Sequence, residues 1–240
     1  GREYIINALD ADKDSYVIEN NQGTGMILTP NGEIDPTVPD FVFNGTTHYI
    51  NPDNYHAFID SDGNLMSDVV YDGDILYFNG TFSDKEILLS KSVKVTGNNP
   101  VFLNTTFIVT SDSVWIEKLN IINQNASRYN AWGIFVADTQ TVKIVDNNIS
   151  VYDPAAAYAV YVYLSSKVYV ENNYLFAHGL SLTFPLLGYG AENCEFNNNE
   201  IVSIGTGEIY QFTGTTDINA NDSEECLGQC LGAVCIGQCL

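Results

Sequence analysis

Basic residues are scarce in this chain of 240 residues, which has 9 Lys and Arg against 30 Asp and Glu and a formal net charge of −21. No Lys or Arg follows Lys167. Nucleic acids, anionic membranes and polyanionic sugars are bound through cations that neutralise phosphate or carboxylate groups. The composition therefore excludes nucleic-acid binding, whereas an acidic surface favours a soluble secreted protein and the recruitment of divalent cations.

Long apolar runs are missing as well, so neither a membrane span nor a signal peptide is expected. Apolar stripes at helical spacing are also missing from the repeats, and the one short helix expected lies around Pro52 to Ile59. Apolar residues still make up 45% of the chain, which is enough to bury a substantial core in one or two domains.

What the chain has instead is a motif, apolar-x-x-Asn-x-apolar, that returns every 26 residues. Its copies occupy 144–149, 170–175 and 196–201. A weaker copy at 116–121 has Leu119 in the Asn position. Short alternating runs such as 142–144 and 168–170 are typical of strands with one buried face. A fixed period of this length indicates stacked repeats, in which each coil buries its apolar face against the next.

We therefore predict an all-β fold, a right-handed parallel β-helix whose coils lie about 4.8 Å apart. Ile144, Val170 and Phe196 should stack inside it. The Asn residues of the motif should stack at a corner and bond through their side-chain amides, as in other in-register ladders. These residues are Asn147, Asn173 and Asn199.

An outward aromatic face follows from the same register. Alternate residues of a strand point in opposite directions, so Tyr161 and Tyr163 lie outside if Val160 and Val162 fill the core. Tyr combines apolar area with a hydroxyl group, so these two residues are candidates for binding glycans or partner proteins.

Four segments are expected along the chain. An irregular β-rich N-terminal segment (1–50) would cap the solenoid or pair with another subunit, and an entry or capping segment (51–88) follows it. The parallel β-helix is expected over 89–215 and a Cys-rich tail over 216–240. Whether the solenoid ends are capped or open matters, because an open edge templates association.

The coil motif resembles the repeats of the pectate-lyase-like parallel β-helix superfamily. The stretch from Asn54 and Tyr55 through 58–65 to 72–81 is similar to the entry segment of the adhesin-like surface proteins of methanogenic archaea. The resemblance covers roughly residues 50–215. It implies a cell-surface protein, but the family is defined by architecture and location, and it transfers little chemistry.

The tail contains four of the five cysteines, and they are Cys226, Cys230, Cys235 and Cys239. Their Cys-x-x-x-Cys spacing in an apolar, Gly-containing peptide disfavours zinc, so we expect disulfides, with at least one between subunits. Cys194 is expected as a small buried residue of a coil.

Six Asn-x-Ser/Thr sequons indicate a secreted glycoprotein. They lie at Asn44, Asn79, Asn104, Asn125, Asn148 and Asn221. Asn125 and Asn148 are the preferred sites, because both are expected beside turns between coils. The predicted location is extracellular, at the cell surface.

The repeats offer little catalytic chemistry. We find no basic pair in one coil for a lyase and no Asp cluster for a hydrolase, and His178 lacks a carboxylate partner at a repeat-related position. Glu171 and Glu195 occupy near-equivalent coil positions and could stack as a carboxylate pair, the arrangement that glycoside hydrolysis requires. Solvated or Ca²⁺-associated faces are the preferred interpretation of these two residues.

Weak Ca²⁺ binding is the one cofactor interaction considered. The candidate ligands are Asp10, Asp12 and Asp14, or Asp60 and Asp62. Ser15 replaces the Gly of a calcium loop in the first cluster, and the second lacks the distal Glu. Polar turns on an acidic surface are the simpler interpretation.

These observations favour a non-catalytic extracellular protein. The first hypothesis is a self-assembling structural subunit of a sheath, surface layer or filament, which binds copies of itself and other surface components and is cross-linked by disulfides. The second is an adhesin-like module that binds glycans or partner cells. The Cys-rich tail and the N-terminal β segment favour the first. A polysaccharide lyase or hydrolase is the third.

Overall fold

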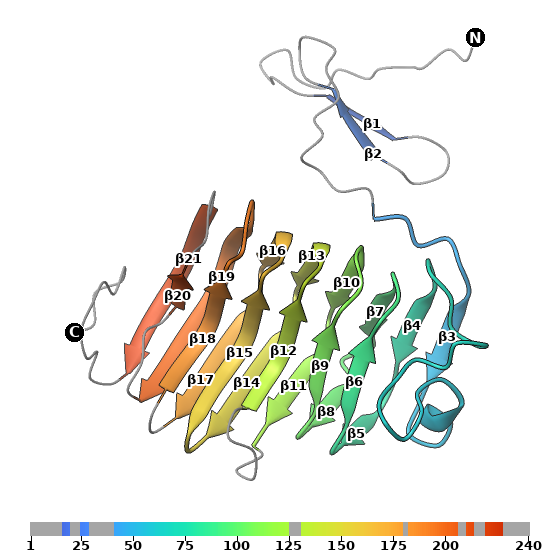
Figure 1. Cartoon of the computed structure of the whole chain (residues 1–240), viewed down its shortest axis with the longest axis horizontal. Coiled ribbons are helices and arrows are strands. Elements are labelled where there is room, and N and C mark those ends of the chain that lie inside the picture. The colour runs from blue at the N-terminus through green and yellow to red at the C-terminus, as the bar shows by residue number, and fades with distance from the viewer. Residues whose placement is uncertain are drawn as a thin grey trace. The chain divides into compact units, whose positions relative to one another are not determined.

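The computed structural model describes residues 41–124, 131–179 and 182–205, together with strands at 16–19, 25–28, 210–213 and 219–227. Residues 1–42 and 43–240 are separate units, and each is described by itself. In the first unit, β1 (Tyr16–Glu19) and β2 (Gly25–Leu28) pair antiparallel. The second unit is a parallel β-solenoid of about six turns (Figure 1).

The turns of the solenoid supply strands to three faces. The first face contains β3 (Thr47–Ile50), β4 (Ile75–Phe78), β7 (Lys94–Gly97), β10 (Val114–Glu117), β13 (Gln140–Val145) and β16 (Ser166–Glu171). The second contains β5 (Thr81–Ser83), β8 (Val101–Leu103), β11 (Asn120–Asn123), β14 (Asn148–Asp153) and β17 (Tyr174–Gly179). The third contains β6 (Glu86–Leu89), β9 (Thr106–Val109), β12 (Ala131–Ala137), β15 (Ala156–Tyr163), β18 (Leu182–Tyr189) and β20 (Tyr210–Thr213).

The long strand β19 (Glu195–Gly205) joins the first two faces. Its beginning pairs with β16 and its end with β17, and β21 (Asn219–Leu227) pairs with both parts. The 26-residue register is confirmed, because Ile144, Val170 and Phe196 are register partners and are completely buried. The predicted stack of apolar residues inside parallel coils is therefore correct.

The predicted Asn ladder lies at the corner between the first and second faces. Nδ2 of Asn147 donates to Oδ1 of Asn173 at 3.0 Å, and Nδ2 of Asn173 donates to Oδ1 of Asn199 at 2.9 Å. The same two oxygens accept the backbone N–H groups of Asn147 and Asn173. The residue before each ladder Asn has a positive φ, which Asn and Asp tolerate better than most residues. These turn residues are Asp146, Asn172 and Asn198.

The end of the solenoid near β3 is covered by residues 51–73. The expected short helix is the 3-10 helix η1 (Tyr55–Ala57), which lies in a loop beside β3 (Figure 1). Its Tyr55 is buried in the same hydrophobic core as the coils, together with Ile59, Leu65 and Val70. The parallel strands already begin at β3, in the segment expected at 1–50, and β4, in the segment expected at 51–88, so they start before residue 89.

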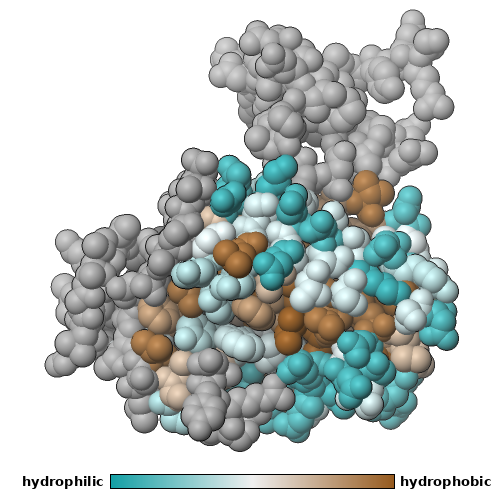
Figure 2. All heavy atoms as spheres, in the orientation of Figure 1, coloured by the Kyte–Doolittle hydropathy of each residue, from teal (hydrophilic) through white to brown (hydrophobic). Residues whose placement is uncertain are grey.

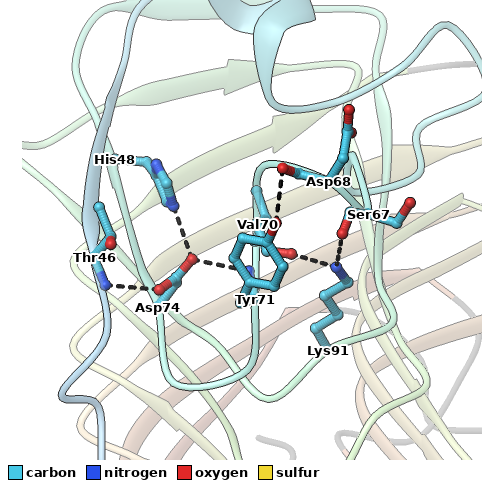
Figure 3. A network of polar contacts seen from close by, with 8 residues as sticks. All are labelled: Thr46, His48, Ser67, Asp68, Val70, Tyr71, Asp74 and Lys91. Carbon is cyan, nitrogen blue, oxygen red and sulfur yellow. Dashed lines mark hydrogen bonds and ion pairs between the residues drawn. The ribbon is translucent and has the colours of Figure 1, made fainter.

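Asp74 connects this entry segment to the first face (Figure 3). Its carboxylate accepts hydrogen bonds from His48 Nε2 at 2.8 Å, from the Thr46 N–H at 2.7 Å and from the Tyr71 N–H at 2.8 Å. Burial raises the pKa of Asp74, but the hydrogen bond from His48 and those from the two backbone groups outweigh it, so the pKa lies below its ordinary value. Close by, Lys91 Nζ donates to the carbonyl oxygens of Ser67 and Val70.

We expect Asp74→Asn to lower the free energy of unfolding at pH 7 by about 2 kcal/mol, since the charge-assisted hydrogen bonds are weakened. A carboxyl group whose pKa is depressed by folding stabilises the native state above its ordinary pKa of about 3.9 and loses that effect as the pH falls through the folded value. Urea unfolding at several pH values should therefore show the difference between variant and wild type shrinking below about pH 4. A difference that does not depend on pH would contradict this role.

Candidate functional site

The third face is free of charge along four consecutive strands. None of the residues of β9, β12, β15 and β18 is Asp, Glu, Lys or Arg, although the chain contains 39 such residues in total, 30 acidic and 9 basic. Polar and charged side chains normally cover the outer surface of a solenoid strand, because that surface faces water. These four strands therefore differ from the ordinary outer surface of a solenoid.

Aromatic and aliphatic side chains occupy the outer side of these strands in register. One row runs across five strands and consists of Leu88, Ile108, Phe135, Tyr161 and Leu187. A second row consists of Trp132, Tyr158 and Phe184, and a third includes Tyr163 and Tyr189. We call the large outward side chains of strands β12, β15 and β18 the aromatic face. They are Trp132, Phe135, Tyr158, Tyr161, Tyr163, Phe184, Leu187 and Tyr189.

The rings of the aromatic face contact one another within and between strands. Trp132 stacks on Phe135 with 5.0 Å between ring centroids, and Phe135 lies 5.2 Å from Tyr161. Tyr163 and Tyr189 are stacked at 5.6 Å with an interplanar angle of 11°. Such pairs hold one another in fixed orientations and are worth about 0.5–1.5 kcal/mol each beyond the area they bury. The face is therefore ordered before any partner binds.

This face forms a hydrophobic cluster of its own, separate from the solenoid core. Ala156, Tyr158 and Phe184 are buried in it, and Trp132, Tyr161 and Leu187 pack against them. At its margins Tyr189 and Leu182 are each 46% exposed and Leu164 is 47% exposed. Figure 2 shows hydrophobic patches of the surface bordered by hydrophilic residues.

Tyr161 and Tyr163 point outward as predicted, since both are half-buried while Val160 and Val162 have no exposed surface. Burial raises the pKa of Tyr161, and the neighbouring tyrosines add to the effect. The pKa of Tyr158 is raised by burial and then by the charge of Asp153. These phenols therefore stay protonated at neutral pH, which suits them to stacking and hydrogen bonding rather than to nucleophilic attack.

The first face has the opposite character. The side chains of Lys94 and Lys143 approach the ring of Trp115 from neighbouring coils, with Nζ 4.7 and 5.1 Å from the ring centroid. Lys94 pairs with Glu117 at 3.0 Å and Lys143 with Glu171 at 2.8 Å. Burial raises the pKa of Glu117, but the hydrogen bond and charge of Lys94 outweigh it and lower the pKa overall. These two lysines are thus each paired with a carboxylate.

Glu171 and Glu195 do not form the carboxylate pair that was considered as an alternative. Glu171 lies opposite Asn197 in the register, whereas Glu195 lies opposite Tyr169 two positions away. The near-repeat in the sequence was misleading, because 171 and 195 are 24 residues apart and the register at this point is 26. His178 lies on the second face, where its ring contacts that of Tyr152 at 5.8 Å.

The second Ca²⁺ candidate is a turn whose acceptors are already in use. Asp60 accepts hydrogen bonds from the N–H groups of Asp62 and Asn64, and Nδ2 of Asn64 adds a third donor. The backbone and side-chain hydrogen bonds from Asn64 lower the pKa of Asp60. Among the described residues, no group of three or more His, Cys, Asp or Glu is placed to hold a metal. Asp10, Asp12 and Asp14 lie outside the described residues.

The sequons differ in their surroundings. Asn44, Asn79 and Asn148 are exposed, as expected for Asn148. Asn104 is half-buried, donates through Nδ2 to Asp84 Oδ1 at 3.0 Å and accepts the Gln124 N–H at 3.1 Å. Asn125 and the side chain of Asn221 lie outside the described residues.

In a host that attaches N-glycans, we expect high occupancy at Asn79 and Asn148 and low occupancy at Asn104. A sugar on Asn104 would replace one amide hydrogen and disturb the hydrogen bonds that join three coils. Mass spectrometry of glycopeptides from a combined tryptic and chymotryptic digest of the folded secreted chain measures all three sites. Full occupancy at Asn104 in protein with wild-type stability would contradict the structural role of its amide.

Cys194 is buried as predicted, and its Sγ donates to the carbonyl oxygen of Glu192 at 3.3 Å. Burial raises the pKa of this thiol, which makes it unreactive. Cys226 lies in β21, where only the backbone is described, opposite Ser203. Cys230, Cys235 and Cys239 lie outside the described residues, so their disulfides remain a prediction.

Comparison with known proteins gives no relative. No family model, no curated protein and no solved structure matches the chain. In the part of the chain that the structure describes, there is no helix with the length and apolar character needed to cross a membrane. The architecture is compatible with a β-helix, and the function must be inferred from the faces themselves.

Proposed function

We propose that the protein is a non-catalytic structural subunit of an extracellular surface assembly, such as a sheath, layer or filament, and that it associates through the aromatic face. The observation that carries this proposal is the absence of charged residues from β9, β12, β15 and β18 of the third face, in a chain whose formal net charge is −21. Ordered aromatic side chains on a rigid scaffold are typical of association surfaces, because they bury much area at little cost in side-chain entropy.

The cap of the solenoid supports lateral rather than end-to-end association. Tyr55, Ile59, Leu65 and Val70 complete the core at the β3 end, so little apolar surface of the coil interior is left there to be covered by another subunit. The aromatic face lies along the side of the solenoid, and Tyr189 and Leu182 at its margins are each 46% exposed. The growth direction we propose is therefore across the solenoid axis.

The resemblance to adhesin-like surface proteins of methanogenic archaea and the six sequons support an extracellular location in this proposal. The cysteines of the tail would cross-link subunits that already associate, because a disulfide requires Cα atoms within about 7 Å of each other. A surface assembly stabilised in this way would lose cross-links in reductant while the solenoid stays folded.

A second candidate is an adhesin-like module that binds glycans. Tyr161, Tyr163 and Tyr189 favour it, because phenol rings stack on sugar rings and their hydroxyl groups can bond to sugar hydroxyls. A third is a polysaccharide lyase or hydrolase. Release of unsaturated or reducing ends from a panel of polysaccharides would replace both non-catalytic hypotheses with this one.

The test is electron microscopy of the full chain, together with light scattering, over a range of protein and salt concentrations and with or without reductant. We expect ordered assemblies or defined oligomers that grow with protein concentration and with salt, since salt screens repulsion between acidic subunits. A chain that stays monomeric under all these conditions but binds a glycan in an array would favour the adhesin hypothesis instead.

A further inference from the structure

We infer that the partner bound by the aromatic face is a second copy of this chain, which packs its own aromatic face against the first. This inference rests on the proposed function and gives it a specific contact. A contact between the same patches of two subunits closes a two-fold dimer, the commonest symmetric interface of soluble proteins. Larger assemblies would then be built from such pairs.

Charge limits which surfaces of two copies can meet. Two subunits with a formal net charge of −21 repel each other at most contacts, and burying an unpaired carboxylate in such a contact is strongly unfavourable. The outer sides of β12, β15 and β18 contain no ionisable group other than Tyr. They are therefore a place where like-charged copies can meet without burying a charge.

The aromatic face is large enough for a weak, reversible dimer. β12, β15 and β18 contain 7, 8 and 8 residues, and at about 3.3 Å per residue and about 4.8 Å per strand they cover roughly 360 Å². Two copies would bury about 730 Å² in total, which is the size of a transient contact that forms at high protein concentration. The outer sides of two sheets can pack about 10 Å apart, as the layers of a β-sandwich do.

The polar groups of the face favour a protein partner over a sugar. A sugar ring presents several hydroxyl groups, and sites that bind it combine an aromatic platform with polar groups around its edge. Apart from the hydroxyl groups of four tyrosines, β12, β15 and β18 present no polar side chain to solvent, because Thr183 is completely buried and donates to the carbonyl oxygen of Gly179. Nε1 of Trp132 is buried without a hydrogen-bond partner, so it does not project toward a bound ring.

The experiment places an Arg in the middle row of the face. Tyr161→Arg would bring a cation of each copy into the contact, and we expect it to weaken association at least about 100-fold, as expected for an unpaired charge in an interface. Tyr152→Arg is the matched control, because Tyr152 is an exposed tyrosine of the second face. Tyr161→Ser, which removes the ring without adding charge, should weaken association by a smaller factor.

Sedimentation equilibrium of the full chain in reductant and high salt measures all four proteins, and the thermal midpoint confirms that each is folded. The expected result is a wild type and a Tyr152→Arg variant with twice the monomer mass, and a monomeric Tyr161→Arg variant. A Tyr161→Arg variant that associates like wild type overturns this inference. The proposed assembly would still stand, but it would use another surface. A wild type that is monomeric throughout overturns both.

Discussion

Asn173→Ala is expected to lower the free energy of unfolding by about 4 kcal/mol, since it removes the central residue of the buried ladder. Oδ1 of Asn173 accepts both the backbone N–H and the Nδ2 of Asn147. Its Nδ2 donates to Oδ1 of Asn199 and to the carbonyl oxygen of Ile144. An alanine removes these four hydrogen bonds, each worth about 1 kcal/mol, and leaves the buried N–H of Asn147 without its acceptor.

Asn197→Ala is the matched control, because the side chain of this half-exposed Asn makes one long hydrogen bond, from Nδ2 to Glu195 Oε2 at 3.4 Å. We expect a loss below about 0.5 kcal/mol there, as for most surface substitutions. Urea unfolding followed by circular dichroism measures both variants. If Asn173→Ala were as stable as Asn197→Ala, the ladder would be a consequence of stacking and not a cause of its stability.

The ladder also explains which turns could be predicted from the sequence. Asn and Asp both adopt the left-handed turn conformation, and of the two only Asn has a side chain that both donates and accepts along the stack. The corner therefore appears in the sequence as a repeated Asn. Asp146, Asn172 and Asn198 supply the turn before the three ladder positions. The apolar positions on either side then follow, because the coils must be in register for the amides to meet.

The earlier turns have the same corner without the signature. Gly80, Pro100 and Leu119 occupy the position of the ladder Asn, and their carbonyl oxygens accept the hydrogen bonds from the next coil. Backbone groups form these hydrogen bonds whatever the side chain, so the corners of the earlier turns cannot be recognised in the sequence. The steps are also shorter there, with Ile121 opposite Phe102, and a search for a 26-residue period misses them.

Only part of the aromatic face was predicted, for a related reason. Strict alternation places Tyr161 and Tyr163 outside, but in β12 the outward residues Trp132 and Phe135 are three positions apart, with Gly133 and Ile134 both buried. A side chain at Gly133 would meet the carbonyl oxygen of Ala159 at 2.7 Å, so the strand is tightly packed at this irregularity. The signal that could have revealed the face is the absence of charge in 131–137, 156–163 and 182–189.

Phe102→Ala is expected to lower the free energy of unfolding by about 4 kcal/mol, because it leaves a cavity in the middle of an aromatic stack. Phe102 is completely buried, and its ring lies 5.3 Å from Phe78, 5.1 Å from Phe82 and 4.9 Å from Phe107. The surrounding rings belong to neighbouring β-strands whose positions are fixed by backbone hydrogen bonds, so they cannot collapse into the space.

Two comparisons separate this cavity effect from a general loss of aromatic area. Phe102→Leu keeps most of the volume and should cost about 1 kcal/mol, since the residual space is small. Phe135→Ala removes a ring from the aromatic face, where one side of the ring meets water, and should cost about 1 kcal/mol in the monomer. Urea unfolding at a protein concentration low enough to keep the chain monomeric measures all three. Equal losses for Phe102→Ala and Phe135→Ala would mean that the inner stack is no more tightly packed than the outer face. A larger loss for Phe102→Ala would show that the inner rings serve the fold, which leaves the outer rings available for a partner.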